Sequence, residues 1–369
     1  MLNYTSHQFF MEQAILESEK ARLLSPPNPW VGCVIVKNNK IIGKGFTQKI
    51  GEPHAEIQAL NLAQESVKDA SLYVTLEPCS HYGRTPPCTH AIIQSGIKEV
   101  FIGIEDPDPR VQGKGIANLK KAGINVQIGF CADKIKKSLA PYLHHRLTSL
   151  PFTILKTGMS IDGRTAAADG SSQWITCQEA RQDVHAYRAH SQAIVIGANT
   201  ALKDSPQLTV RHPDYPLIKQ PLRVILDSQG KTPSIGPLFD CSIAPTLVVT
   251  THQTDSKRIH EWEKAGAEIL FVSPSKDSTG VDLYETWMHL GKKSILQAFV
   301  EGGSILHSSL LKTNLFQQLL IYMGPLLIGS QGQPFFTHSG SSLKESQKMH
   351  LEEILKIGDS VRLLYKPSS

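Results

Sequence analysis

The stretch SLYVTLEPCSHYGRTPPC at residues 71–88 decides how the first half of the chain folds. Residues 71–76 are mostly apolar and predict a buried strand that ends before Cys79, and Cys88 begins an expected helix over 88–95. Outward from this stretch we expect further helices at 54–65 and 114–122 and further strands at 99–104 and 124–128. Short apolar strands that alternate with helices predict a mostly parallel sheet with helices on both faces.

The N-terminal segment predicts a helix followed by a hairpin. Residues 5–24 carry apolar side chains among polar ones, and the prolines that follow end this helix. Two apolar runs, 31–36 and 41–46, are separated by the turn-forming residues 37–40, which predicts an antiparallel pair of strands. Residues 132–150 are rich in lysine and histidine and less regular, so we expect them to connect two domains.

A second alternating series follows, with strands expected near residues 152–157, 192–197, 222–227, 246–250, 268–272, 295–301 and 316–323. Thr176 and Glu179 have the spacing of a capping box, so a helix is expected to start there and to reach about residue 189. No repeat at a fixed period relates the two halves, and 369 residues suit two or three domains. We therefore expect two different α/β domains, at residues 1–147 and 148–369.

Composition and charge exclude several classes of protein. A hydrophobic content of 40% is too high for a disordered chain, and the longest uncharged run, 313–343, is interrupted by glutamines and prolines and is unsuited to a membrane span. Residues 1–150 carry 17 lysines and arginines against 13 aspartates and glutamates, a net charge of +4, and the rest of the chain carries +1. Neither value is the strong basic excess expected of a nucleic-acid-binding protein.

The cysteines indicate a reducing compartment. Six cysteines in 369 residues are too few for a disulfide framework, and the N-terminus lacks the basic segment and apolar core of a secretory signal. In a reducing cytoplasm, paired cysteines more often bind a metal. We therefore expect a cytoplasmic protein with neither a membrane nor a nucleic acid among its partners.

Three potential metal ligands and one carboxylate stand out in the first half. His54 and Glu56 open an expected helix, and Cys79 and Cys88 follow, with eight residues between the two cysteines. One histidine and two thiolates leave a fourth tetrahedral position for water, as a catalytic zinc site requires. Zinc lowers the pKa of such a water towards neutrality, and Glu56 would carry the proton to a leaving nitrogen.

The spacing of His54 and Glu56 restricts where the metal can lie. Residues two apart point to nearly opposite sides of a helix, so these two can converge only at its first turn. The positive end of the helix dipole there favours thiolate ligands. The alternative is a structural zinc site with four protein ligands, closed by His81 or His90.

In the second half a strand, a glycine pair and a helix follow one another in FVEGGSIL, residues 299–306. Backbone amides at such a helix start can hold a phosphate, although a glycine pair also occurs in any tight turn. The G-x-G-x-x-G fingerprint of dinucleotide-binding folds is absent from the sequence. Arg164, Arg188 and Arg211 are candidates for binding an anionic substrate, although single arginines are usually surface residues.

Four motifs of the first half occur together: PNPWVG at 27–32, GEPHAE at 51–56, the stretch 75–88, and DPDP at 106–109. With them, the first half resembles the deaminase domain of the bifunctional pyrimidine deaminase/reductase family of riboflavin biosynthesis. Zinc deaminases of nucleic acids carry H-x-E…P-C-x-x-C, with two residues between the cysteines where this chain has eight.

The segments KTGMSIDGR at 156–164, SQWIT at 172–176, DSPQLTVR at 204–211 and GDSVRL at 358–363 are similar to the reductase domain of the same family. The likeness thus covers nearly the whole chain. It implies a cytidine-deaminase-like α/β/α zinc domain followed by a dihydrofolate-reductase-like α/β domain that uses NADPH.

The resemblance also implies roles for individual residues. In the first domain the zinc ligands would be His54, Cys79 and Cys88. The proton donor would be Glu56, and Asn28 would contact the pyrimidine. NADPH would contact Gly158, Trp174, Thr200, Asp204, Ser228, Gly303, Ser304, Ile305, Leu306, His307, Ser308 and Ser309. The reductase substrate would meet Ser172, Arg188, Leu208, Arg211 and Glu301. Two arginines suit a ribose phosphate, because guanidinium binds phosphate through two hydrogen bonds.

Three positions depart from the family pattern. Trp30 is unusually large for the variable place in Asn-Pro-x-Val-Gly, Thr47 stands where many relatives have histidine, and Ser205 replaces the common Asp or Asn before Pro206. The zinc ligands and Glu56 are intact. These departures therefore concern substrate contacts more than the chemistry.

One hypothesis and three alternatives follow. We expect a homo-oligomeric enzyme that deaminates 2,5-diamino-6-(5-phosphoribosylamino)pyrimidin-4(3H)-one with zinc and then reduces the ribosyl group of the product, 5-amino-6-(5-phosphoribosylamino)uracil, with NADPH. The alternatives are a nucleic-acid base deaminase with an appended binding domain, a zinc-stabilised scaffold without activity, and a deaminase whose second domain has lost reduction.

Overall fold

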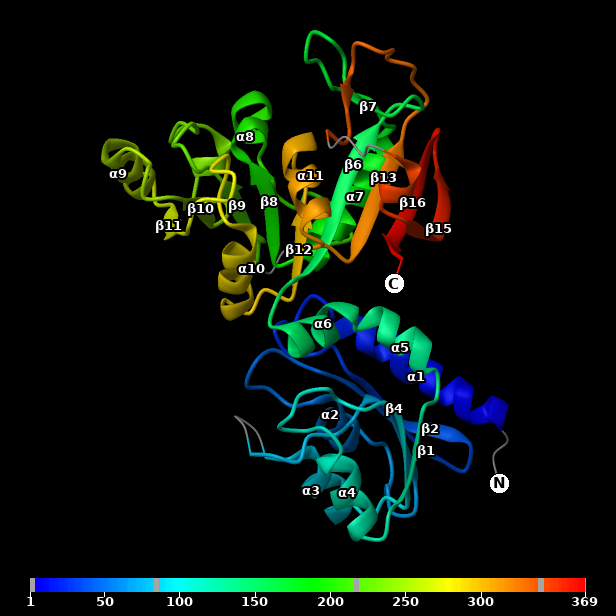
Figure 1. The fold of residues 1–369 in the computed structure, drawn as a ribbon. Coiled ribbons are helices and arrows are strands. Elements are labelled where there is room, and N and C mark those ends of the chain that lie inside the picture. The colour runs from blue at the N-terminus through cyan, green and yellow to red at the C-terminus, as the bar shows by residue number, and fades with distance from the viewer. Residues whose placement is uncertain (1–3, 83–85, 216–218, 338–341, 369) are drawn as a thin grey trace. The chain divides into compact units, whose positions relative to one another are not determined.

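The computed structural model describes residues 4–82, 86–215, 219–337 and 342–368, and its contacts divide the chain into two compact units (Figure 1). Unit 1 is Met1–Ser149 and unit 2 is Leu150–Ser369, a division close to the boundary expected after residue 147. Among the described residues, no helix combines the length and apolar character that crossing a membrane requires.

Unit 1 is a five-stranded sheet between two layers of helices. In spatial order its strands are β2 (Lys40–Phe46), β1 (Gly32–Lys37), β3 (Ser71–Leu76), β4 (Glu99–Ile104) and β5 (Asn125–Ile128). β3, β4 and β5 are parallel, and β1 is antiparallel to both of its neighbours. On one face lie α1 (Tyr4–Ala21) and α5 (Ala132–Ser138), and on the other α2 (Ala55–Asn61), α3 (Cys88–Gln94) and α4 (Lys114–Lys121) (Figure 1).

The hairpin of β1 and β2 holds a helix close to each face of the sheet. Its turn consists of Asn38 and Asn39, whose φ values of 49° and 62° fit a type I′ turn. A Cβ on Gly32 would lie 1.9 Å from the Ala14 oxygen of α1, and a Cβ on Gly45 would lie 2.2 Å from the Ala55 oxygen of α2. Glycine at these two positions therefore lets both helices approach the strands.

The segment expected to be an irregular connection is helical instead. Most of residues 132–150 form α5 and α6 (Ala140–Thr148). A proline lies in the first turn of α6, where its missing N–H would have no partner within the helix. Ile135, Leu139 and Tyr142 are buried. The many lysines obscured this apolar stripe, which is the feature that stabilises both helices against the rest of unit 1.

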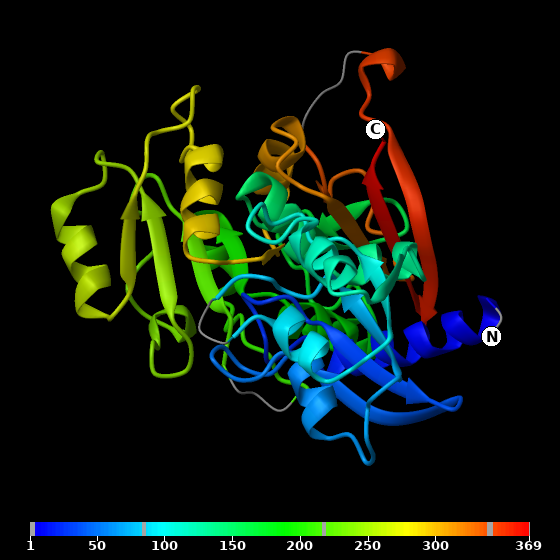
Figure 2. The same ribbon diagram turned by 90° about the horizontal axis from the view of Figure 1, so that it is seen from below.

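Unit 2 contains a nine-stranded sheet and a small two-stranded sheet of β7 (Arg164–Ala166) and β14 (Gln333–Pro334). In spatial order the strands of the larger sheet are β11 (Glu268–Phe271), β10 (Thr246–Thr250), β9 (Leu222–Leu226), β8 (Ala193–Gly197), β12 (Gln297–Val300), β6 (Phe152–Met159), β13 (Gln318–Met323), β16 (Ser360–Pro367) and β15 (Met349–Ile357). The seven from β11 to β13 are parallel, and the hairpin of β15 and β16 adds an antiparallel edge. Figure 2 shows this hairpin in red at one edge and α9 (Ser256–Lys264) near the other.

Alternate residues of the central strands fill two separate cores. Val195 of β8 belongs to a cluster that includes Trp287 of α10 (Leu283–Lys292) and Leu310 of α11 (Ser304–Lys312). Its neighbours Ile194 and Ile196 belong to a cluster with Trp262 of α9. Both faces of the sheet are thus covered, as the continuous apolar strands predicted.

The capping box expected at Thr176 is wrong. Helix α7 (Gln178–His190) has Cys177 as its N-cap and no side-chain cap. The Cys177 N–H donates instead to Ser360 Oγ at 3.0 Å, and its thiol donates to the Ile357 carbonyl at 3.1 Å. The start of α7 is therefore held by the C-terminal hairpin, which the sequence did not predict.

Candidate active sites

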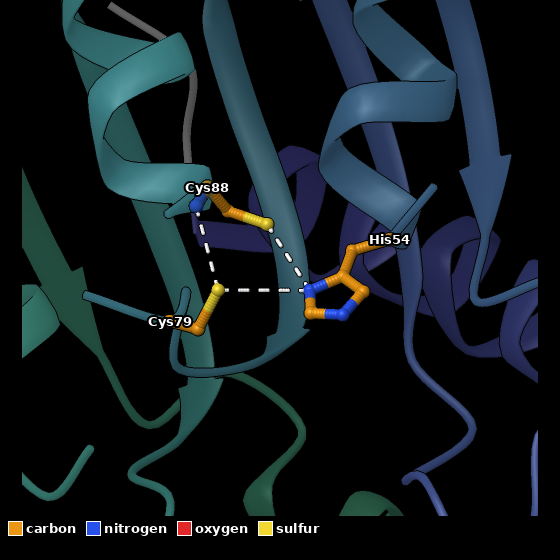
Figure 3. A group of neighbouring side chains, drawn as sticks. All are labelled: His54, Cys79 and Cys88. Carbon is orange, nitrogen blue, oxygen red and sulfur yellow. Dashed lines mark hydrogen bonds between the residues drawn. The ribbon is translucent and has the colours of Figure 1, made fainter. Parts of the chain in front are cut away.

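Three side chains of unit 1 converge from three elements (Figure 3). His54 is the N-cap of α2, Cys79 follows the end of β3, and Cys88 is the first residue of α3. The Nδ1 atom of His54 lies 3.6 Å from Cys79 Sγ and 3.3 Å from Cys88 Sγ. All three ligand atoms lie within 4.8 Å of one another, and they form the one group of possible metal ligands among the described residues.

The spacing of these atoms fits zinc. Bonds of about 2.3 Å to sulfur and about 2.0 Å to nitrogen at tetrahedral angles separate a nitrogen and a sulfur ligand by about 3.5 Å. Cys79 is also prepared as a thiolate, because hydrogen bonds from Cys88, including one from its backbone N–H at 3.4 Å, lower the pKa of Cys79 to about 4. With three protein ligands, a fourth position stays available to a water or a substrate.

Glu56 lies beside this group, in the first turn of α2. Its side chain is buried, and burial raises the pKa of its carboxyl to about 7, against the opposing effect of His54. His54 and Cys79 are close enough for their charges to affect this pKa, in opposite directions. His54 and Glu56 thus converge at the helix start, and a carboxyl with a pKa near neutrality can both accept and return a proton.

The two histidines considered as a fourth ligand do not join the group within the described part of the chain. His90 is exposed and its Nε2 contacts Gln94 at 3.3 Å, while the Nδ1 of His81 is buried without a hydrogen-bond partner. A closed four-ligand site is therefore not what the geometry supports.

A buried carboxylate fixes the loop that carries Cys79. Glu77 Oε1 accepts the N–H groups of Gly115 and Ile116 at 2.9 and 3.2 Å, and Oε2 accepts those of Gly113 and Asp106 at 3.1 and 3.3 Å. These donors include the free amides at the start of α4, which has no side-chain cap of its own. This role was not predicted from the sequence, although a glutamate between an apolar strand and Pro-Cys was a usable signal.

Unit 2 contains a cavity of about 950 Å³ at the carboxyl ends of its parallel strands. Gly158 of β6, Gly197 of β8, Ser228 after β9 and Glu301 after β12 line it. The N-terminus of α11 opens on the same cavity, and its backbone amides suit a phosphate group. Lysines at its wall, Lys156, Lys203, Lys231, Lys276 and Lys312, suit an anionic ligand, although four aspartates also contribute.

Glu301 is a charged group of this cavity that two cationic side chains hold. Its Oε1 accepts Arg188 Nε at 2.5 Å and its Oε2 accepts Arg188 Nη2 at 3.0 Å. Lys156 Nζ lies 3.8 Å from Oε2. Burial alone would raise the pKa of Glu301, but Arg188 and Lys156 outweigh it and lower this pKa to about 2.

Two family descriptions match the two halves of the chain. "RibD C-terminal domain" matches residues 151–363, and "Cytidine and deoxycytidylate deaminase zinc-binding region" matches residues 4–104. The riboflavin biosynthesis protein RibD of Chlamydia pneumoniae is 44% identical over 98% of this chain and 95% of its own length. The RibD of Escherichia coli is 38% identical over 96% of this chain and 98% of its own.

This chain belongs to the RibD family. Among solved structures, Acinetobacter baumannii RibD (form 1) is 36% identical, with a TM-score of 0.90 over 100% of both chains. A diaminohydroxyphosphoribosylaminopyrimidine deaminase/5-amino-6-(5-phosphoribosylamino)uracil reductase of Thermotoga maritima is 31% identical, with a TM-score of 0.87 over 99% of both chains. The expected fold, a cytidine-deaminase-like zinc domain followed by a reductase domain, is therefore confirmed, and zinc and NADPH are the cofactors of these two domains.

The departures from the RibD pattern in unit 1 have structural explanations. Trp30 is buried, and its Nε1 donates to Ser138 Oγ of α5 at 3.1 Å. Thr47 is buried, and its Oγ1 accepts the N–H of Val31 at 3.1 Å. Asn28, the expected pyrimidine contact, matches the pattern and lies in the loop between α1 and β1, where Ser25 Oγ donates to its carbonyl at 3.2 Å.

The RibD-type residues expected in unit 2 fall into two groups. Those that line the cavity are Gly158, Ser172, Thr200, Asp204, Ser228, Glu301, Gly303, Ser304, Ile305, Leu306, His307 and Ser309. Those that do not are Trp174, Arg188, Leu208, Arg211 and Ser308. Trp174 is 64% exposed with the Arg181 guanidinium 4.2 Å above its ring, and the Leu208 side chain is buried in the hydrophobic core.

Proposed function

We propose that unit 1 hydrolyses one exocyclic amine of 2,5-diamino-6-(5-phosphoribosylamino)pyrimidin-4(3H)-one, with one water consumed and one ammonia released. The observation that carries this proposal is the convergence of His54, Cys79 and Cys88 beside the buried carboxyl of Glu56. Zinc, when held by the three ligands, supplies a Lewis acid and an acidic water. The family relationship, with its matching zinc-binding region, supports the same reaction.

In this proposal Glu56 moves the protons. Its carboxylate takes a proton from the attacking water and its carboxylic acid delivers a proton to the departing nitrogen, so that the group returns to its starting state. A pKa of about 7, caused by burial, leaves both forms accessible near neutral pH. Asn28, in the loop before β1, is proposed as a pyrimidine contact.

We propose that unit 2 reduces the product, 5-amino-6-(5-phosphoribosylamino)uracil, at C1′ of its ribosyl group. NADPH, when bound, supplies a hydride, and one proton on the ring oxygen completes the opening of the sugar to a ribityl chain. The residues proposed to hold NADPH are Gly158, Trp174, Thr200, Asp204, Ser228 and the segment 303–309, most of which line the cavity. Ser172, Arg188, Leu208, Arg211 and Glu301 are proposed to hold the substrate.

We propose that the deaminase domain comprises residues 1–147 and the reductase domain residues 148–369. We further propose that the protein works in the cytoplasm as a homo-oligomer on a small phosphorylated pyrimidine, with no nucleic acid as partner. The modest net charge of +4 over residues 1–150 supports the proposal that no nucleic acid is a partner.

Mass spectrometry of the full-length zinc protein with the diaminopyrimidine ribosyl phosphate tests both reactions. Exchange of one amine for oxygen without NADPH, followed by the gain of two hydrogens with it, is the expected result. In Glu56→Gln, ammonia release should fall by at least about a thousandfold, because both proton transfers lose their carrier. Reduction of supplied deaminated product should be unchanged in this variant. Full deamination by Glu56→Gln would remove the role assigned to Glu56.

A further inference from the structure

Two loops of unit 1 meet at the edge of the sheet that carries the zinc site. Strand β1 is antiparallel to β3, so the β1 loop (residues 26–31) lies beside the residues that follow β3, where Cys79 is found. Strand β4 is parallel to β3, so the β4 loop (residues 105–113) reaches the same edge. The N–H of Asp106 in the β4 loop donates to Glu77 Oε2 at 3.3 Å. Both loops are therefore placed to border the zinc site.

Arg146 of α6 contacts both of these loops. Its Nη2 donates to the carbonyl of Pro27 in the β1 loop at 3.4 Å, directly before Asn28. Its Nε lies 4.0 Å from Oδ2 of Asp108 in the β4 loop, and its guanidinium lies 5.0 Å from the centre of the Tyr142 ring. The Arg146 side chain is 24% exposed and the Asp108 side chain is 8% exposed. A planar guanidinium carries donors that point in several directions, so one side chain can hold both loops.

The two loops differ in how firmly the rest of unit 1 holds them. In the β4 loop the buried carboxylate of Asp106 accepts the hydroxyl of Tyr142 at 3.0 Å, so this loop stays attached to α6 without Arg146. In the β1 loop the backbone of Asn28 bonds to Ser25, three residues earlier. The Asn28 N–H donates to the Ser25 carbonyl at 2.8 Å, and the Asn28 carbonyl accepts Ser25 Oγ at 3.2 Å. The contact from Arg146 therefore ties the Asn28 end of the β1 loop to the β4 loop.

We propose that Arg146 is a positioning residue for the deamination, which holds the β1 loop against the β4 loop so that Asn28 faces the pyrimidine ring. The far end of the β1 loop is held separately by Trp30, whose Nε1 donates to Ser138 Oγ, so loss of Arg146 frees mainly the Asn28 end. This inference rests on the proposed deaminase function and on the proposed contact of Asn28. Arg146 acts on substrate binding through Asn28, and Glu56 carries the protons.

Arg110 provides a matched control within the β4 loop. It holds the Asp108 carboxylate more closely than Arg146 does, with Nε 2.9 Å from Oδ1 and Nη2 2.5 Å from Oδ2, and its side chain is exposed. Arg110 belongs to the β4 loop itself, and among the described residues it forms no hydrogen bond or ion pair with the β1 loop. Removing Arg110 therefore leaves the bridge between the two loops intact.

Ammonia release by the full-length zinc protein from the diaminopyrimidine ribosyl phosphate tests the proposal. In Arg146→Met, KM should rise at least about fivefold while kcat changes by less than about twofold, because the weakened contact binds substrate and transition state alike. In Arg110→Met, KM should change by less than about twofold, because an exposed ion pair contributes little. Both variants should keep their zinc and reduce supplied deaminated product at the wild-type rate, which shows that each is folded.

A double-mutant cycle measures whether Arg146 acts through Asn28. In an Asn28→Ala background, Arg146→Met should raise KM by less than about twofold further, because the group through which it acts is gone. If Arg146→Met loses zinc, Arg146→Lys takes its place in the test. The ammonium of lysine is a point charge that cannot hold both loops, so KM should still rise at least about threefold.

Three results would each overturn the proposal: an unchanged KM in the Arg146 variant, an equal rise of KM in Arg110→Met, or independent effects of the two substitutions in the cycle. A fall of kcat with an unchanged KM would do the same, because the substitution would then act on the chemistry instead of on binding. Failure of the proposed function itself is distinguishable, since the wild-type protein would then release no ammonia from this substrate.

Discussion

At the scale of single residues, Thr47 shows how one hydroxyl maintains the entrance to the first strand. Its Oγ1 accepts the Val31 N–H at 3.1 Å, and both residues are buried. Thr47→Val keeps the shape but leaves that N–H without an acceptor, so the free energy of unfolding of unit 1 should fall by about 1–2 kcal/mol. Urea unfolding of the full-length protein measures this change in free energy. Thr47→Ser keeps the hydroxyl and is the control, and a larger loss in Thr47→Ser than in Thr47→Val would show that the methyl group, rather than the hydrogen bond, matters.

Ser205 adopts a backbone conformation that its side chain does not favour. It ends α8 (Ala198–Asp204) with φ 39° and ψ 51°, in the left-handed region, and its side chain is exposed. Asparagine enters this region more readily than serine. Ser205→Asn should therefore raise the free energy of unfolding of unit 2 by roughly 0.5 kcal/mol. A higher thermal midpoint is the expected readout, and a lower one would mean that contacts of the serine hydroxyl outweigh the backbone preference.

Single residues also mark the limit of prediction from sequence. The zinc ligands could be predicted because each carries its own motif, and the motifs together point to one chemistry. The pairing of Arg188 with Glu301 could not, because 113 residues separate them and no local pattern links the two. An arginine in a sequence looks the same whether it meets a phosphate or a buried carboxylate.

At the scale of elements, Glu77 joins the end of β3 to the start of α4. Four backbone N–H groups donate to its two oxygens, and Cys79 lies two residues further on. In Glu77→Gln the amide keeps one acceptor oxygen and leaves some donors unmatched, so unit 1 should lose about 2–4 kcal/mol of stability. Zinc should also leave several-fold faster in a chelator competition, because the Cys79 loop becomes less fixed.

Glu99→Gln is the matched control for this prediction. Glu99 lies on β4 of the same unit, but it accepts hydrogen bonds from two side chains, Ser71 at 3.0 Å and Asn125 at 3.3 Å, instead of from backbone amides. Replacing the Glu99 carboxylate by an amide should change the rate of zinc release little. Equal acceleration in both variants would mean that general destabilisation, rather than the anchoring of the loop, controls the metal.

Elements were predictable where their apolar pattern had one interpretation. The seven parallel strands of unit 2 are short, continuous apolar runs, and each was found close to its expected place. Strand β15 was missed because Leu351, Ile354 and Leu355 have helical spacing and remain partly exposed. Its partner strand β16 determines that it is extended, through pairing that no local pattern encodes.

At the scale of the whole molecule, the two proposed cofactors belong to different units. All three zinc ligands lie in unit 1, and the cavity proposed for NADPH is lined by residues of unit 2 alone. Each unit has its own sheet, so each should respond to its own ligand. Chelation should abolish ammonia release and leave the reduction of supplied deaminated product intact.

Hydrogen exchange on the full-length protein should show this division directly. NADPH at about one hundred times its Kd should stabilise the part that binds it by about 2.7 kcal/mol, and slower exchange should be confined to peptides after residue 150. Chelating zinc should speed exchange only in peptides before residue 149, most strongly around α2 and α3, because His54 caps α2 and Cys88 begins α3. The control is NADPH added to the chelated protein, which should protect unit 2 to the same extent. Weaker protection there would show that the zinc site and the reductase cavity are energetically coupled, so that the two activities are not independent.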